Sequence, residues 1–237
     1  MPASLYGKNG LDREPIHDRY RVESGLAACA GTTLESGRRI VQFTDMHSWS
    51  PGYTQSELDD AQAHYGLRFP PDLVALLLER QLTLGYDWRG ENAEIRRMLA
   101  WPLKMLMFDV ENGFWWPDWG VRPNLPKDRL EVVETALQAA PRLIPLYGHR
   151  FLPETPSEAG NPVFSMHGFD TIYYGANLME YFRNEFEGKH QIGSTRHILF
   201  WSDIVGRFEE AYAFYAESGK SRASVTVIQD LLRNKDA

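Results

Sequence analysis

The sequence contains a single cysteine, Cys29, among its 237 residues. One thiol can form neither an internal disulfide nor a zinc site built from cysteines, and this usage fits a reducing compartment. Long hydrophobic runs are also missing, because the longest wholly aliphatic stretch, residues 73–78, is far shorter than the ~20 residues of a membrane span. The first residues hold no apolar signal core. We therefore expect a cytoplasmic protein without a membrane segment.

Positive charge is scarce in the middle of the chain. Residues 54–187 contain twelve Lys and Arg against twenty Asp and Glu, a net charge of −8, whereas the whole chain has −7. An acidic segment repels phosphate backbones and anionic lipids and attracts basic proteins. We therefore expect no direct nucleic-acid or membrane partner and favour a basic protein partner, with simple solubility as the alternative explanation of the charge.

Hydrophobic residues make up 43% of the chain and aromatic residues 13%, which is enough for a packed core. We divide the chain into an N-terminal extension (1–53), a central domain (54–187) and a C-terminal helical extension (188–237). The first segment is rich in Gly, Ser, Thr and charge, with one β-like stretch at residues 40–44. Cys29 lies there among small residues and is predicted to be an inert thiol.

Helix signals recur through the central and C-terminal segments. Thr54 and Glu57 form a capping-box pattern before a helix that Gly66 ends, and Pro71 begins a second helix. Later helix starts are predicted from Asp128 with Glu131, from Asn177 with Glu180, and from Ser202. A last helix is predicted over residues 224–234, although its β-branched residues disfavour it.

Strand signals lie between these helices. Residues 101–109 are apolar enough for a strand, or for a short helix followed by a strand, and residues 114–116 continue as an extended aromatic stretch after an Asn-Gly turn. Further strands are predicted at 143–146, 162–166 and 171–174. This order of helices and strands predicts an α+β fold with a mainly antiparallel sheet and flanking helices.

Several short motifs within residues 54–205 together resemble one family. They are Phe108-Asp109-Val110, Trp119-Gly120-x-Arg-Pro123, Pro145-x-Tyr-Gly-His149-Arg150, Gly160-Asn-Pro-Val-Phe-Ser165 and Tyr173-Tyr174-Gly175. With the opening helix pair, they identify the chain as resembling the SUKH superfamily of yeast cell-wall-assembly regulators and bacterial toxin-immunity proteins. The resemblance implies a single SUKH-like domain without common catalytic machinery. It also implies a role in binding protein, either neutralising a toxin such as a nuclease or acting as a scaffold.

The aromatic run Trp115-Trp116-Pro117-Asp118-Trp119 is the best candidate for contact with a protein partner, because tryptophan is enriched at binding hot spots. The alternative is a core or edge strand in which at most two of the tryptophans pack on the same face. An immunity protein would cover a basic active-site cleft with carboxylates and aromatic anchors. The residues expected to do so are Asp109, Glu111, Trp115, Trp116, Asp118, Trp119, Asp170 and Tyr173.

Two enzyme alternatives stay open but are disfavoured. A metal-dependent hydrolase could use His149, His167 and Asp170, with Asp109 as a fourth ligand, but no close ligand spacing supports convergence, so no metal or cofactor is expected. Ser165 near His167 could act as a nucleophile, yet the surrounding residues do not match a nucleophile elbow.

Three arginines near the motifs have two open roles. Arg89, Arg122 and Arg150 could each pin a loop by pairing with a carboxylate, or could bind an acidic ligand. His149 is expected to be a satisfied polar residue beside Arg150 and the Asp170 carboxylate. We favour the loop-pinning role for all three.

Overall fold

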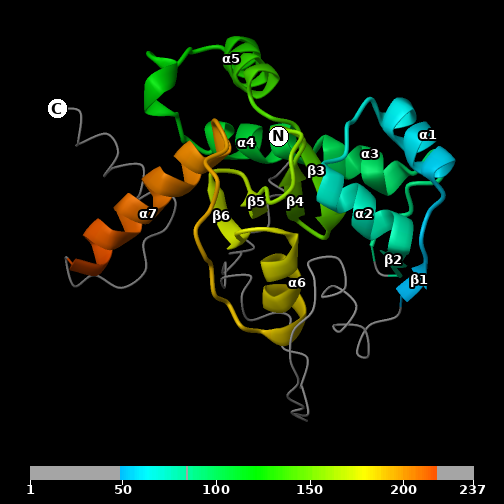
Figure 1. The fold of residues 1–237 in the computed structure, drawn as a ribbon. Helices are drawn as coiled ribbons and strands as arrows, with labels where there is room; N and C mark the ends of the chain where they lie inside the picture. The colour runs from blue at the N-terminus through cyan, green and yellow to red at the C-terminus, as the bar shows by residue number, and fades with distance from the viewer. Residues whose placement is uncertain (1–48, 84, 218–237) are drawn as a thin grey trace, which may run out of the picture. The chain divides into compact units, whose positions relative to one another are not determined.

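The computed structural model describes residues 49–83 and 85–217, with side chains as far as Glu209, and in this part the fold is α+β (Figure 1). The helices are α1 (Gln55–Tyr65), α2 (Pro71–Glu79), α3 (Ala93–Leu99), α4 (Trp101–Glu111), α5 (Pro126–Ala139), α6 (Leu178–Glu187) and α7 (Trp201–Glu217), with a 3-10 turn η3 (Pro117–Trp119). The strands are β1 (Trp49–Pro51), β2 (Arg80–Leu82), β3 (Leu143–Tyr147), β4 (Arg150–Pro153), β5 (Val163–His167) and β6 (Asp170–Gly175).

The opening helix pair forms as its capping signals predict. The Glu57 N–H donates to the Thr54 hydroxyl at 3.2 Å, and the Glu57 carboxylate accepts the Thr54 N–H at 2.7 Å. Gly66 ends α1 in a left-handed conformation with φ of 62°, and Pro71 opens α2. Strand β1, which precedes this pair, is antiparallel to β2, and Tyr53 directly after it is buried.

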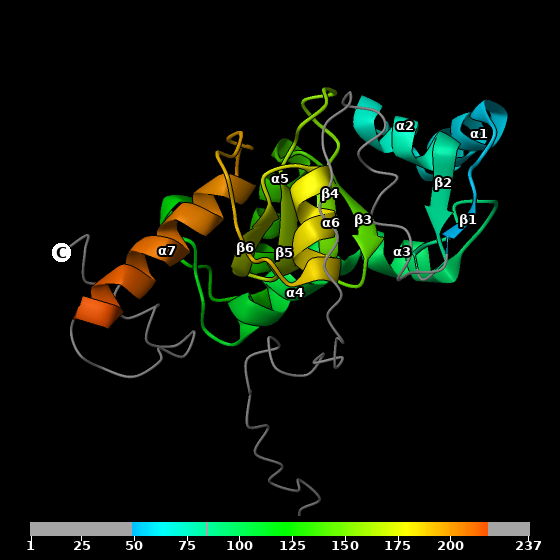
Figure 2. The same cartoon turned by 60° about the horizontal axis from the view of Figure 1, so that its bottom comes forward.

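The main sheet is an antiparallel meander in the order β3-β4-β5-β6, which confirms the predicted antiparallel sheet. Strand residues alternate between its two faces. One face, with Phe151, Phe164 and Met166, packs against α4 and α7. The opposite face, with Leu152 and Val163, packs against α6 and the core formed by α1 and α2. Figure 2 shows α6 lying over the strands of this sheet.

The prediction of a strand within residues 101–109 is wrong, because this segment forms most of helix α4 from its first residue onward. Leu, Met and Lys are unbranched and lose little side-chain entropy in a helix, and Pro102 lies in the first turn, where its missing N–H costs nothing. The buried residues Met105, Leu106, Asp109 and Val110 repeat with a helical period. Residues two positions apart point to the same face of a strand, but in a helix their directions differ by about 200°. Asp109 and Glu111 therefore point in nearly opposite directions from α4.

Residues 114–116 form no strand either. Pro117 follows them and begins the turn η3, and within the described chain these three residues pair with no other strand. Proline has no N–H to donate to a ladder, which explains why the extended stretch stops there. Strands β2 and β4 and helix α3 were not predicted.

Two predicted helix caps differ from the structure. Helix α5 begins at Pro126 with Leu125 at the N-cap and no side-chain cap, so Asp128 lies inside its first turn and does not cap it. Ser202 lies within α7, and the Phe200 N–H preceding it donates to Asp203 at 2.9 Å. The Asn177 cap of α6 is confirmed, because its side chain accepts the Glu180 N–H at 3.0 Å.

Some predictions fall outside the described residues. These are the β-like stretch at 40–44, the inert thiol of Cys29 and the helix at 224–234. The sequence also predicts that Ala211, Tyr212 and Tyr215 lie on the inner face of the helix that starts near Ser202, and their side chains lie beyond those described.

Candidate functional site

The tip of the β5–β6 hairpin lies in an aromatic cluster formed by the predicted tryptophans. The ring centroid of Phe169, at this tip, is 4.0 Å from that of Phe114 and 5.7 Å from those of both Trp116 and Trp119. Trp115 packs edge-on against Trp119 at 5.3 Å. Trp116 is buried in the core cluster, and Trp115 and Trp119 are half-buried and pack against it. The segment is irregular and ends in a 3-10 turn, so the alternation expected of a strand does not apply.

Asp109 is buried beneath the same hairpin tip. Its Oδ2 accepts the Phe169 N–H at 2.8 Å, and a Cβ on Gly168 would collide with this carboxylate. Gly168 has a φ of 70°, so glycine fits both the backbone conformation and the space. Asp109 therefore fixes the tip of the hairpin from below.

Glu111 and Arg129 join the end of α4 to the start of α5. The guanidinium donates to both carboxylate oxygens, at 2.7 and 3.0 Å, and these hydrogen bonds lower the pKa of Glu111. The same guanidinium donates to the carbonyl oxygens of Pro123 and Asn124 at 3.1 and 2.7 Å. Arg129 is almost wholly buried while Glu111 stays accessible, so this pair presents one carboxylate edge to solvent.

Asp118 is also paired. Arg207 of α7 donates to both of its carboxylate oxygens, at 2.9 and 2.8 Å, and the same guanidinium lies 4.7 Å from the centroid of the Trp116 ring. The pair is accessible, which limits its contribution to the free energy of unfolding. Asp118 therefore joins η3 to α7 through Arg207, and its carboxylate remains exposed to solvent.

The last two predicted residues lie on β6. Asp170 is exposed and stands opposite His167 at the start of the strand. Tyr173 stacks on Phe164 with centroids 5.3 Å apart, and its hydroxyl hydrogen bonds to the Ser202 hydroxyl at 2.7 Å. Tyr173 thus connects β6 to α7.

Exposed apolar side chains accompany these carboxylates, and sequence reasoning missed them. Val121 is 95% exposed and Leu125 62% exposed, both in the segment between η3 and α5, and Phe108 on α4 is 42% exposed. The available signal was the occurrence of apolar residues in a stretch otherwise rich in Gly, Pro and Asn.

The segments that carry these side chains are joined by hydrogen bonds of Arg122 and Arg129, and two accessible carboxylates lie on the same segments. Phe108 and Glu111 are one helical turn apart on α4, and Arg129 holds the segment before α5 beside Glu111. In sequence, Asp128 follows Leu125 by three residues and is exposed in the first turn of α5. We call this the acidic–apolar surface, and it consists of Phe108, Glu111, Val121, Leu125 and Asp128.

A second polar cluster surrounds Arg150 on the sheet face that carries α6. Its guanidinium donates to Glu185 at 2.8 Å and to the Ser165 hydroxyl at 2.8 Å, contacts His149 Nε2, and lies 3.6 Å from the centroid of the Tyr174 ring. Arg150 therefore lies beside His149, as expected, and the carboxylate that pairs with Arg150 is Glu185. Ser165 accepts a hydrogen bond from an arginine, an arrangement that does not activate a nucleophile.

His149 makes the free energy of unfolding depend on pH. Burial, and to a smaller extent the charges of Arg150 and His167, lowers the pKa of His149 to about 4. The pKa of a histidine in an unfolded chain is about 6.5. Below pH 6.5 the unfolded chain therefore binds a proton that the folded chain does not. The free energy of unfolding is expected to fall between pH 6.5 and 4, by up to about 3 kcal/mol from this group.

Replacing His149 with glutamine is expected to remove that loss, because glutamine keeps an acceptor for Arg150 and does not titrate. Urea unfolding at pH 7.5 and 4.5 would measure it, with His197→Gln as a matched substitution at an accessible histidine. An identical pH dependence in the wild-type and His149→Gln proteins would contradict the assignment.

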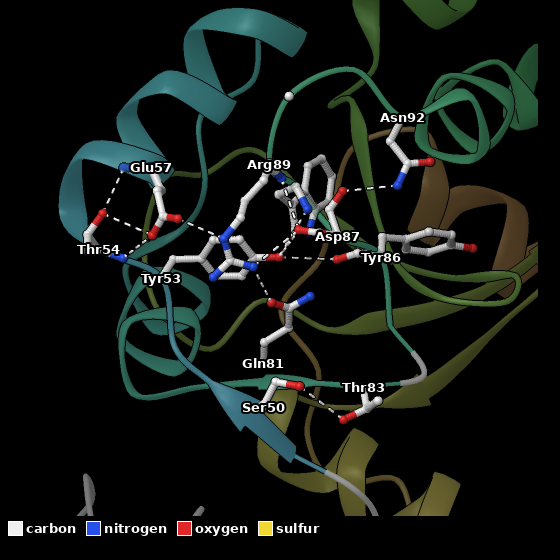
Figure 3. A network of polar contacts seen from close by, with 12 residues as sticks. Ser50, Tyr53, Thr54, Glu57, Gln81, Thr83, Tyr86, Asp87, Arg89 and Asn92 are labelled. Atoms are coloured by element: carbon white, nitrogen blue, oxygen red, sulfur yellow. Dashed lines mark hydrogen bonds and ion pairs between the residues drawn. The ribbon is translucent and has the colours of Figure 1, made fainter.

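Arg89 lies at the centre of a third network, between α1 and the segment before α3 (Figure 3). Its guanidinium donates to Glu57 at 2.7 Å and to Gln81 at 2.9 Å, and lies 4.1 Å from the centroid of the Tyr53 ring. The Thr54 N–H and Arg89 lower the pKa of Glu57 to about 2. From the segment before α3, Arg89 pairs with a carboxylate, as the loop-pinning role requires. Arg150 also pairs with a carboxylate but joins strand β4 to helix α6, and Arg122 donates to the Val110 carbonyl oxygen.

The described residues do not bring together a metal site. Among residues 49–83 and 85–209, no three His, Cys, Asp or Glu side chains are grouped so as to hold an ion. His167 packs against the Trp101 ring at 5.8 Å, and Asp109 accepts a hydrogen bond from the hairpin tip.

In the same part of the chain, no helix has the length and apolar character of a membrane span. No protein-family model, curated protein or solved structure matches this sequence.

Proposed function

We propose that this chain is a cytoplasmic, non-enzymatic binding protein of SUKH type that neutralises a basic toxin domain by covering its active site. The motifs that resemble the family support the class of function. The acidic–apolar surface is the single structural observation that carries the binding role. It combines side chains that water solvates poorly with carboxylates that would attract a basic cleft.

The structure changes which residues are proposed to make the contact. Trp116 and Asp109 are buried around the β5–β6 tip, so they are not accessible for contact with a partner. Val121 and Leu125 are proposed as the apolar anchors in place of the tryptophans. The carboxylates of Glu111 and Asp128 would accelerate association with a basic partner. An apolar centre with a charged rim is the usual anatomy of a protein interface.

The proposal predicts that a toxin domain is encoded beside this gene, and that domain is the binding partner to test. Co-expression is expected to restore growth of cells that carry the active toxin domain. The association rate of the purified proteins is expected to fall at least about tenfold from low to high salt, because salt screens steering between opposite charges. A rate independent of salt would contradict the charge contribution. Binding without restored growth would favour the scaffold alternative.

A matched pair of substitutions tests the surface itself. Leu125→Arg introduces a cation among the apolar anchors and is expected to weaken binding by about 10-fold or more. Leu199→Arg is the control, because Leu199 is 61% exposed, almost the same as Leu125, and lies before α7 outside this surface. Equal affinities of the two variants would contradict the proposed interface.

A further inference from the structure

The segment between η3 and α5, residues 120–125, contains no helix or strand but is attached through its backbone carbonyl groups. At its first residue, the indole N–H of Trp115 donates to the carbonyl oxygen at 2.7 Å. Towards its other end, Nη1 of Arg129 donates to the carbonyl oxygens of Pro123 and Asn124 at 3.1 and 2.7 Å. Two side chains therefore hold the two ends of this segment.

The guanidinium of Arg129 connects this segment to α4. Its Nε and Nη2 donate to the two carboxylate oxygens of Glu111 at 3.0 and 2.7 Å, so all three of its nitrogens take part in hydrogen bonds. Only 7% of the Arg129 side chain is exposed. Taking an arginine out of water is costly, and apolar residues of similar volume often stabilise a fold equally well. The rigid fork of donors instead fixes the position of the carbonyl groups that it contacts.

Apolar side chains of the same segment point into solvent. Val121 is 95% exposed and Leu125 is 62% exposed. Apolar side chains that stay in water contribute little to folding, because the hydrophobic effect depends on the area removed from water. A segment that is held in place with such side chains outward is arranged for contact with a partner. It is also ordered before binding, which lowers the entropic cost of association.

We propose that Trp115 and Arg129 are positioning residues of the acidic–apolar surface. They hold residues 120–125 in the bound arrangement before the partner arrives, and they act through the backbone without touching the partner themselves. This inference rests on the proposed function, because it concerns the same surface.

The arrangement also indicates the chemistry of the partner's complementary site. An apolar patch would accommodate Val121 and Leu125, and a cation at its edge would face Glu111. An ionised carboxylate has about four acceptor positions, and Arg129 uses two of those of Glu111, so the others can accept hydrogen bonds from the partner's cation.

Arg129→Lys tests the positioning role in the free protein. Lysine keeps the charge but has a single nitrogen, which cannot reach Glu111 and both carbonyl oxygens at once. NMR relaxation of the backbone amides of Val121, Asn124 and Leu125 is expected to show a rigid segment in the wild type and a mobile one in this variant.

Arg150→Lys is the matched control, because Arg150 is also mostly buried, with 13% of its side chain exposed, and also pairs with a carboxylate. That carboxylate belongs to α6, which lies across the sheet from α4 and α5 (Figure 1). Arg150→Lys is expected to leave the mobility of residues 120–125 unchanged. Trp115→Phe is a second and milder test, since it keeps an aromatic ring, removes the indole donor and is expected to increase the mobility of Val121.

Affinity for the toxin domain is the second readout. Arg129→Lys is expected to bind about tenfold more weakly, because only a fraction of its molecules hold the segment in the bound arrangement. The factor should persist at high salt, since the substitution leaves the net charge unchanged and salt screens only the attraction between charges. Arg150→Lys is expected to bind like the wild type.

The possible results separate this inference from the proposed function. A segment that stays rigid in Arg129→Lys and Trp115→Phe would overturn the positioning role, as would a mobile segment in Arg129→Lys with wild-type affinity. An equally mobile segment in Arg150→Lys would also overturn it, because the effect would then reflect a general loss of stability. The proposed interface fails separately, if Leu125→Arg binds as tightly as its control.

Discussion

Replacing Gly168 with alanine is expected to lower the free energy of unfolding by about 3–5 kcal/mol. A left-handed conformation costs a non-glycine residue about 1–2 kcal/mol. The new methyl group would also collide with the Asp109 carboxylate, whose displacement leaves the buried Phe169 N–H without its acceptor. Such an unpaired group adds about 1–3 kcal/mol. Urea denaturation followed by tryptophan fluorescence would measure the loss.

Gly148→Ala is the matched control for this prediction. Gly148 also occupies a hairpin turn with positive φ, 52°, but nothing lies within 4 Å of the position that its Cβ would take. Alanine there is expected to cost only the backbone contribution of about 1–2 kcal/mol. If both substitutions cost the same, the contact between Asp109 and the hairpin tip contributes nothing to stability.

The sequence correctly predicted the start of those helices that begin with a capping side chain or a proline. The reciprocal hydrogen bonds of Thr54 and Glu57, the proline at the start of α2 and the Asn177 cap each involve residues within one turn, so the sequence displays them directly. The same reasoning failed for α4. An apolar run of that length fits a buried helix as well as a buried strand, and only packing decides between them.

The candidate site depended on contacts that no local pattern records. The ion pair between Asp118 and Arg207 joins residues 89 positions apart, and the hydrogen bond from the Phe169 N–H to Asp109 spans 60 positions. Tryptophan and aspartate in an aromatic, proline-containing segment are equally typical of an interface and of a packed turn. The sequence therefore identified the region correctly as aromatic and acidic, but not which of its side chains reach solvent.

Trp116→Ala is expected to lower the free energy of unfolding by about 3–5 kcal/mol, because it removes a buried ring that is only 5% exposed and leaves a cavity. The ring is stacked on Phe169, with the two planes 12° apart, and is covered by the guanidinium of Arg207. The variant therefore loses contacts to the β5–β6 hairpin and to α7 together. Urea denaturation of the variant and of Leu125→Arg would compare a buried with an exposed position.

The two substitutions are expected to separate stability from binding. The free energy of unfolding of Leu125→Arg should lie within about 0.5 kcal/mol of the wild-type value, since the Leu125 side chain is mostly in solvent. The same variant should nevertheless lose affinity for the proposed toxin partner. Trp116→Ala should have a lower free energy of unfolding. Measured without urea, at a temperature at which the variant is still folded, it should retain most of its affinity. The reverse pattern, with Trp116→Ala stable and unable to bind, would place this tryptophan in the interface and move the proposed contact to the aromatic cluster.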